Sequence, residues 1–225
     1  MNNQFETLTE NYDSKTSTYY YNPRLEMLSF IPKDAKRLLD IGCSTGGFGA
    51  NLKKVTSTIE IWGIEPYSSA ASEASKQLDK VINGIFEKDM PELEGQKFDV
   101  IVFNDVLEHL VNPEKVLKDC HQYLNEGGVV VASIPNIMYF PLFVKQLLLK
   151  EDWEYMKEGV FDNTHLRFFT KKSMLRLFKD SGYTVQHIQG INAYQSTLFS
   201  ILNFFFLNKF KNWRYQQYVV VSKLP

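Results

Sequence analysis

Residues 37–47 read RLLDIGCSTGG, a short apolar strand that includes Asp40 and runs directly into a glycine-rich turn. Gly42 and Gly46 can adopt backbone angles that other residues resist, and their missing Cβ atoms let a ligand approach the main chain. The helix expected after Gly46 directs its unpaired N–H groups at the turn. The stretch therefore predicts a strand, turn and helix that bind a ligand.

Two acidic residues narrow the choice of ligand. A carboxylate at Asp40 would repel a pyrophosphate and would suit a cationic or amine-bearing ligand. A second apolar strand, residues 59–64, ends in Glu65. An acid at this distance after the glycine turn is placed to accept hydrogen bonds from both hydroxyls of a ribose. A dinucleotide-binding oxidoreductase stays open at this point, although Asp40 disfavours it.

Residues 38–46 resemble motif I of the class I S-adenosylmethionine-dependent methyltransferases. Glu65 stands where that family keeps its ribose acid. Ser44 replaces the usual middle glycine of the motif and is small enough to keep the turn. The resemblance implies S-adenosylmethionine as the cofactor and S-adenosylhomocysteine as its product.

Two later segments strengthen this resemblance. Residues 104–110 read NDVLEHL and resemble the segment after the fourth strand in the small-molecule O-methyltransferase branch that includes quinone-biosynthesis enzymes, with Glu108 and His109 as the hallmark. Residues 164–170 read THLRFFT and resemble segments of the same branch that are tied to bacterial surface-polysaccharide synthesis. The methyltransferase interpretation is therefore favoured over the oxidoreductase.

The resemblance also implies which residues hold the cofactor. Relatives commonly carry Gly-Asp where this chain has Gly84 and Ile85, so backbone groups of Ile85 and Phe86 are expected to bracket the adenine, with Asn83 or Glu87 as a polar contact. The expected cofactor-binding residues are Asp40, Gly42, Cys43, Ser44, Gly46, Glu65, Pro66, Gly84, Ile85, Phe86, Asn104 and Asp105.

Strands that alternate with helices predict an α/β fold, a doubly wound Rossmann-like sheet. With the resemblance, it should have seven strands, mostly parallel, with the last strand antiparallel and inserted into the sheet. The expected strands are 37–41, 59–64, 81–83, 98–103, 129–134, 183–190 and 216–222. The expected helices include one that starts at Pro23, and others over 68–78, 112–124 and 170–182. Gly127 and Gly128 are expected to form a turn before the fifth strand.

We expect one methyltransferase domain over residues 1–225. An N-terminal helical cap, 1–34, precedes a core formed by 35–135 and 183–225. Residues 136–182 are rich in aromatic side chains and form an insertion after the fifth strand. Because open α/β sheets bind ligands beyond the carboxyl ends of their strands, this insertion should cover the active site.

Transfer to an oxygen atom requires a base, and His109 and His165 are the candidates because imidazole titrates near neutral pH. His109 is preferred, since it follows the fourth strand closely whereas His165 lies on the insertion. A structural role for either histidine stays open. Tyr139, His165 and Arg167 are the expected substrate-binding residues.

The favoured reaction is methylation of a hydroxyl on a small molecule such as a sugar or a quinone-like metabolite. N- or C-methylation, NAD-dependent oxidoreduction and non-catalytic cofactor binding remain alternatives. No cluster of carboxylates beside an asparagine stands out, so no metal is expected.

The composition favours a cytoplasmic protein that binds no nucleic acid. The 225 residues carry a formal net charge of −1, with 44% hydrophobic and 23% charged residues. Only Cys43 and Cys120 are present, which is too few for a disulfide framework. The aromatic segment 196–213 is expected to pack in the core or at a dimer interface, with peripheral membrane contact or a substrate wall as alternatives.

Overall fold

The computed structural model describes residues 23–225, apart from the side chain of Leu147. The segment 1–22, including most of the expected N-terminal cap, lies outside the described residues. The strands are β1 (Arg37–Ile41), β2 (Glu60–Glu65), β3 (Lys80–Asn83), β4 (Phe98–Asn104), β5 (Leu124–Pro135), β6 (Thr184–Ala193) and β7 (Tyr215–Lys223). The helical segments are η1 (Leu25–Phe30), α3 (Gly47–Val55), α4 (Ser68–Ala74), η2 (Pro91–Leu93), η3 (Leu107–His109), α5 (Pro113–Asp119), η4 (Cys120–Tyr123), α6 (Phe140–Leu142), η5 (Phe143–Leu149), α7 (Lys171–Asp180), α8 (Thr197–Phe205) and η6 (Lys211–Arg214).

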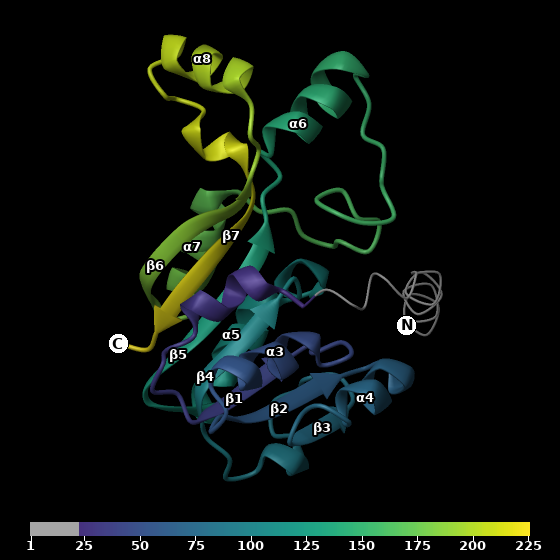
Figure 1. Ribbon diagram of the computed structural model, residues 1–225, viewed down its shortest axis with the longest axis vertical. Coiled ribbons are helices and arrows are strands. Elements are labelled where there is room, and N and C mark those ends of the chain that lie inside the picture. The colour runs from purple at the N-terminus through teal and green to yellow at the C-terminus, as the bar shows by residue number, and fades with distance from the viewer. Residues whose placement is uncertain (1–22) are drawn as a thin grey trace.

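All seven strands form one sheet with the order β3-β2-β1-β4-β5-β7-β6 (Figure 1). The pairs from β3 to β5 are parallel, whereas β7 lies antiparallel between β5 and β6. The predicted Rossmann-like fold with an inserted antiparallel last strand is therefore confirmed. The order reverses between β1 and β4, and open sheets of this kind bind ligands at such a reversal.

Helices cover both faces of the sheet because successive strand residues point to opposite sides. Leu38 belongs to a buried cluster with Phe48 of α3 and Ala74 of α4. Its neighbour Leu39 belongs to a second cluster with Leu117 of α5 and Phe178 of α7. The near-continuous apolar sequences of β1 and β4 thus reflect strands that are buried on both faces.

Several predicted boundaries differ from the structure; the helix expected over 68–78, for example, ends at Ala74. The helix expected from Pro23 is a 3-10 segment that begins at Leu25, because Arg24 adopts a left-handed conformation (φ 46°). The helix expected over 112–124 ends at Asp119 and continues as the 3-10 turn η4. The fifth strand begins at Leu124, and Gly127 (φ 74°) lies inside it where the pairing with β4 shifts register, so a bulge replaces the expected turn.

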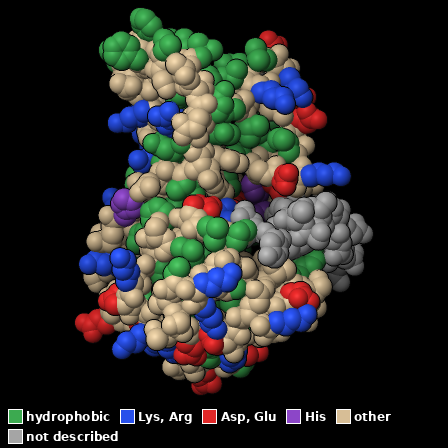
Figure 2. All heavy atoms as spheres, viewed as in Figure 1, with side chains coloured by type: hydrophobic (Ala, Val, Ile, Leu, Met, Phe, Trp, Pro, Cys, Tyr) green, Lys and Arg blue, Asp and Glu red, His purple; other side chains and the backbone are tan. Residues whose placement is uncertain are grey.

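The insertion and the segment before β7 extend beyond the end of the sheet, where α6 and α8 project (Figure 1). Apolar side chains gather at this end (Figure 2). Phe199 is buried there, whereas Phe205 and Leu207 are 74% and 91% exposed. Contact of 196–213 with a membrane or a second copy stays a prediction. Among residues 23–225, no helix combines the length and apolar character needed to cross a bilayer.

The helix α7 shows how local sequence sets element ends. The Thr170 hydroxyl accepts a hydrogen bond from the Ser173 amide, and the Ser173 hydroxyl accepts one from the Thr170 amide, which forms a capping box. At the other end, Gly182 (φ 87°) follows the last turn, and the Tyr183 amide donates to the Phe178 carbonyl. This is the glycine C-terminal motif predicted for Gly182.

We predict that Thr170→Ala lowers the free energy of unfolding by about 1 kcal/mol, because the first turn of α7 loses its cap. Urea denaturation measures the change. Thr58→Ala, at an exposed position, is the matched control and should change stability by about 0.5 kcal/mol or less. Equal effects in the two variants would contradict the capping role.

Candidate functional site

A cavity of about 1560 Å³ opens at the carboxyl ends of β1, β2 and β4. The glycine turn, the residues after β2, β3 and β4, and residues 158–166 of the insertion contribute to its wall. Of the predicted cofactor-binding residues, those that line it are Asp40, Gly42, Cys43, Ser44, Glu65, Pro66, Gly84, Ile85, Phe86, Asn104 and Asp105. The structure thus brings together residues from four separate strand ends.

The glycine turn is fastened to the end of β2. The amides of Gly42 and Cys43 both donate to the Ile64 carbonyl, at 2.8 and 3.1 Å. The Glu65 carboxylate accepts hydrogen bonds from the Ser44 amide (2.8 Å) and the Tyr67 amide (3.0 Å). Glu65 therefore orients the turn as well as facing the cavity.

Glycine is required at position 42 by space and by backbone angle. Gly42 has φ 76°, and a Cβ atom there would lie 2.6 Å from Val106 Cγ2. Gly46 has a different role from the one expected, since it does not line the cavity. A Cβ atom on Gly46 (φ 82°) would lie 3.1 Å from Ala74 Cα, so this glycine permits close packing of the turn on α4.

Two buried carboxyl groups give this end of the cavity its electrostatic character. Burial, and secondly the charge of Glu65, raise the pKa of Asp40 to about 7. Burial also raises the pKa of Glu65, while the amides of Tyr67 and Ser44 act in the opposite direction. Asp40 Oδ1 is buried and has no hydrogen-bond partner within residues 23–225. A ligand that carries positive charge or donates hydrogen bonds would satisfy both groups.

The loop after β3 forms an apolar part of the wall. Ile85 is 50% exposed, while Phe86 is buried and packs edge-on against Tyr123. The Asn83 amide group donates to the carbonyls of Glu65 (2.9 Å) and Pro66 (3.1 Å). Asn83 therefore holds the loop. Asn83 and Glu87 were the two polar contacts expected for an adenine, and of these Glu87 lines the cavity whereas Asn83 does not.

A buried polar network follows β4. Asp105 has φ 56°, and its carboxylate forms an ion pair with Arg24 and accepts hydrogen bonds from Ser133 Oγ (3.1 Å) and Gln217 Nε2 (2.9 Å). Sequence reasoning missed Ser133 and Gln217, although a polar residue inside an apolar strand was a usable signal. The neighbouring Asn104 side chain has buried amide atoms without a partner among the described residues.

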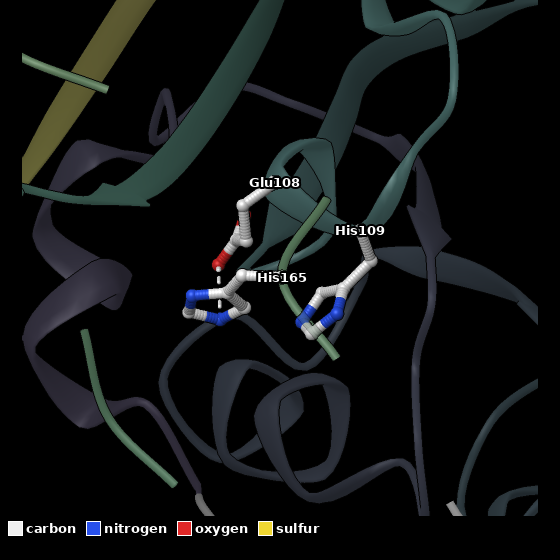
Figure 3. Close-up of side chains that lie close together, drawn as sticks. All are labelled: Glu108, His109 and His165. Atoms are coloured by element: carbon white, nitrogen blue, oxygen red, sulfur yellow. Dashed lines mark ion pairs between the residues drawn. The ribbon is translucent and has the colours of Figure 1, made fainter. Parts of the chain in front are cut away.

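Glu108, His109 and His165 lie close together (Figure 3), and all three line the cavity. His165 Nε2 lies 3.9 Å from Glu108 Oε1, and the two imidazole rings pack edge-on with centroids 4.8 Å apart. Burial, and secondly the charge of Asp105, hold the pKa of Glu108 well above its usual range. The two candidate bases from distant parts of the sequence therefore belong to one cluster.

Tyr139 and Arg167 lie outside the residues that line the cavity. The Tyr139 ring packs edge-on against Tyr194, and Arg167 Nη2 donates to the Val111 carbonyl at 2.6 Å. Tyr139 therefore has a contact outside the cavity and Arg167 binds the cavity-lining residue Val111 without lining the cavity, whereas His165 does line it.

The buried acids, the glycine cradle and the position of the cavity define a class I S-adenosylmethionine-dependent methyltransferase fold. Residues 12–188 match the methyltransferase domain family, and the chain belongs to this family. A solved S-adenosylmethionine-dependent methyltransferase from Archaeoglobus fulgidus is similar in fold, with a TM-score of 0.65 and 17% identity over 89% of this chain and 91% of the other.

Curated relatives include two ubiquinone biosynthesis O-methyltransferases. The mitochondrial protein of Schizosaccharomyces pombe is 22% identical over 160 residues, which are 69% of this chain and 58% of that protein. The Burkholderia pseudomallei protein is 26% identical over 165 residues, 69% of this chain and 68% of that protein. The aligned part thus spans little more than half of the first relative.

We predict that Asp40→Asn changes how the ligand-free protein's stability depends on pH. The raised pKa of Asp40 means that the folded state holds a proton which the unfolded state releases, so stability falls as pH rises from about 4 to about 7. A pKa near 7 against the ordinary 3.8 corresponds to a loss of up to about 4 kcal/mol. Urea denaturation at several pH values measures the free energy of unfolding. This part of its decline with pH should be missing in Asp40→Asn and should persist in Asp34→Asn, a change at an exposed position. Parallel pH profiles for wild type and Asp40→Asn would contradict the assignment.

Proposed function

We propose that this protein transfers a methyl group from S-adenosylmethionine to a hydroxyl of a small molecule. The observation that carries the proposal is that Asp40 and Glu65 line the same cavity as Glu108, His109 and His165. Its volume of about 1560 Å³ exceeds the roughly 300–1,000 Å³ of common ligand sites. This supports binding of a cofactor and a second small molecule together.

The residues present fit the cofactor. S-adenosylmethionine supplies a methyl group on a positively charged sulfur when it is bound. Glu65 would accept hydrogen bonds from the ribose, and Asp40, which lacks a partner at Oδ1, would face the positively charged part. Gly42 and Ser44 provide the close main-chain approach, while Ile85 and Phe86 provide apolar contacts.

The chain's contribution to the transfer itself is to position the acceptor and to handle its proton. His109 and His165 line the cavity together with Glu65, so we assign proton handling to these histidines. The ubiquinone biosynthesis O-methyltransferases among the relatives support an oxygen acceptor on a metabolite. The acceptor class, a quinone-like phenol or a sugar, belongs to the proposal.

We predict that Glu65→Ala weakens binding of S-adenosylhomocysteine by about 1–3 kcal/mol, because charged hydrogen bonds are lost. Isothermal titration calorimetry measures the affinity. Glu65→Gln separates the loss of the charge from the loss of the hydrogen bond that orients the turn, since the amide oxygen can still accept from the Ser44 amide. Glu73→Ala, an exposed acid on α4, is the control and should bind as wild type does. Unchanged affinity in Glu65→Ala would remove the ribose assignment.

We predict that His109→Ala lowers turnover by about 10²–10⁴ and leaves the affinity for S-adenosylhomocysteine nearly intact. A methyl-transfer assay with a panel of phenols and sugars, run beside calorimetry, measures both quantities. The control is His187→Ala, because His187 is exposed on β6. Loss of cofactor binding with normal turnover at saturation would instead place His109 in the cofactor pocket.

A further inference from the structure

Two amide side chains from the last two strands line the cavity and have no role in the function proposed above. Strand β7 is antiparallel to β5, so it begins at the edge of the sheet where β5 ends, and Gln217 pairs there with Pro135. Strand β6 is antiparallel to β7 in turn, so it ends at the same edge, with Asn192 as its next-to-last residue. Asn192 and Gln217 therefore line the same cavity as the glycine turn and the two histidines.

The Asp105 carboxylate fixes the orientation of both amides. A carboxylate only accepts hydrogen bonds, so the Gln217 atom that lies 2.9 Å from Asp105 Oδ1 is the donor Nε2. Gln217 Oε1, on the other branch of the amide, accepts a hydrogen bond from Asn192 Nδ2 at 2.9 Å. Asn192 Oδ1 is thereby left as an acceptor, and it receives no hydrogen bond within residues 23–225.

The carboxylate at the start of this chain of hydrogen bonds is itself held from several sides. Asp105 forms an ion pair with Arg24 and accepts a hydrogen bond from Ser133 Oγ at 3.1 Å. Arg24 Nη2 donates to the same hydroxyl at 2.7 Å. Gln217 is buried and cannot rotate its amide without losing a hydrogen bond to a charged group, which is stronger than a neutral one. Asn192 therefore rests on a rigid support.

The backbone conformation of Asn192 is a second, independent observation. Asn192 has φ 53°, and Asp105 and Arg24 have φ values of 56° and 46°. All three residues line the cavity. Left-handed angles are uncommon for residues other than glycine, and such residues cluster at ligand sites where the surrounding structure holds them. Within β6, Asn192 alone has a positive φ, so the strand leaves regular geometry where it meets the cavity.

We propose that Asn192 determines acceptor specificity by accepting, through Oδ1, a hydrogen bond from a second hydroxyl of the methyl acceptor. Gln217 is the positioning residue that aims the amide. This inference rests on the proposed function, because the acceptor must occupy this cavity. The acceptor is then a diol or a polyol, with one hydroxyl beside the histidines and another at Asn192.

The chemistry of the Asn192 oxygen defines what this position rejects. An ether oxygen, a carbonyl or a hydrogen atom bound to carbon offers no good donor to Oδ1. A site built to bind a hydroxyl discriminates against the analogue that lacks it, because its polar group is then left without a partner. A molecule with a single hydroxyl should therefore bind more weakly than its dihydroxy counterpart.

The test is an NMR titration of the full-length protein, saturated with S-adenosylhomocysteine, with matched pairs of probes. Catechol is compared with phenol, and methyl glucoside with its monodeoxy analogues. Wild type should bind the member with the extra hydroxyl about 5- to 10-fold more tightly in at least one pair, the effect of one neutral hydrogen bond. Asn192→Gly tolerates the left-handed backbone and removes the amide, so it should bind both members of that pair equally.

Asn208→Gly is the matched control, because Asn208 is an exposed asparagine with φ 59° that does not line the cavity. It should keep the preference of wild type. Gln217→Leu tests the support, and it should weaken binding of the probe with the extra hydroxyl while leaving its partner nearly unchanged. Equal weakening of both probes would remove the positioning role of Gln217. Circular dichroism confirms that the variants fold.

The same preference in Asn192→Gly and Asn208→Gly would overturn the inference, as would the absence of binding by every probe. A methyl-transfer assay on the same probes separates this result from the proposed function. Transfer that does not depend on Asn192 removes only the specificity role. Binding that depends on Asn192, without transfer to any probe, supports the recognition site and removes the proposed function.

Discussion

Two buried carboxyl groups in one cavity are the constraint on which the site depends. Parallel pairing aligns Asp40 with Gly63 and so brings the ends of β1 and β2, with Asp40 and Glu65, to the same edge of the sheet. Burial, and secondly the charge of Glu65, raise the pKa of Asp40 to about 7. Glu65 is held by the Ser44 and Tyr67 amides, so it cannot turn away. A protein selected for stability alone would avoid this pair, and ligand binding accounts for it.

The sequence predicts best those parts of the fold that are determined by residues close together in the chain. The turn at Gly42, the cap at Thr170 and the left-handed Gly182 each depend on residues within a few positions, and all three occur as expected. The predicted start of β5 was wrong. Glycine is typical of turns, which suggested a turn at Gly127, but pairing with β4 extends the strand through this residue. Arg24 forms an ion pair with Asp105, far away in the sequence, and local propensity does not report such a contact.

The distinction between local sequence and contacts between distant residues also holds for the site. The spacing between the glycine turn and Glu65 predicts a cavity residue, because a strand, helix and strand repeat has a nearly constant length. Glu108 lies beside His165 where the Glu108 carbonyl accepts hydrogen bonds from two amides of the insertion, a contact that no sequence spacing encodes. Tyr139 and Arg167 were chosen by chemical type alone, and neither lines the cavity: Tyr139 packs against Tyr194, and Arg167 donates to the carbonyl of Val111, which does line it.

The ligand that binds beside Asp40 and Glu65 in the cavity decides the function of the protein. Calorimetric titration of wild-type protein with S-adenosylhomocysteine and, separately, with NAD measures it directly. We predict one S-adenosylhomocysteine per chain and no detectable NAD binding, since the two acids suit a ribose and a positive charge but repel a pyrophosphate. Binding of NAD without binding of S-adenosylhomocysteine would contradict the account.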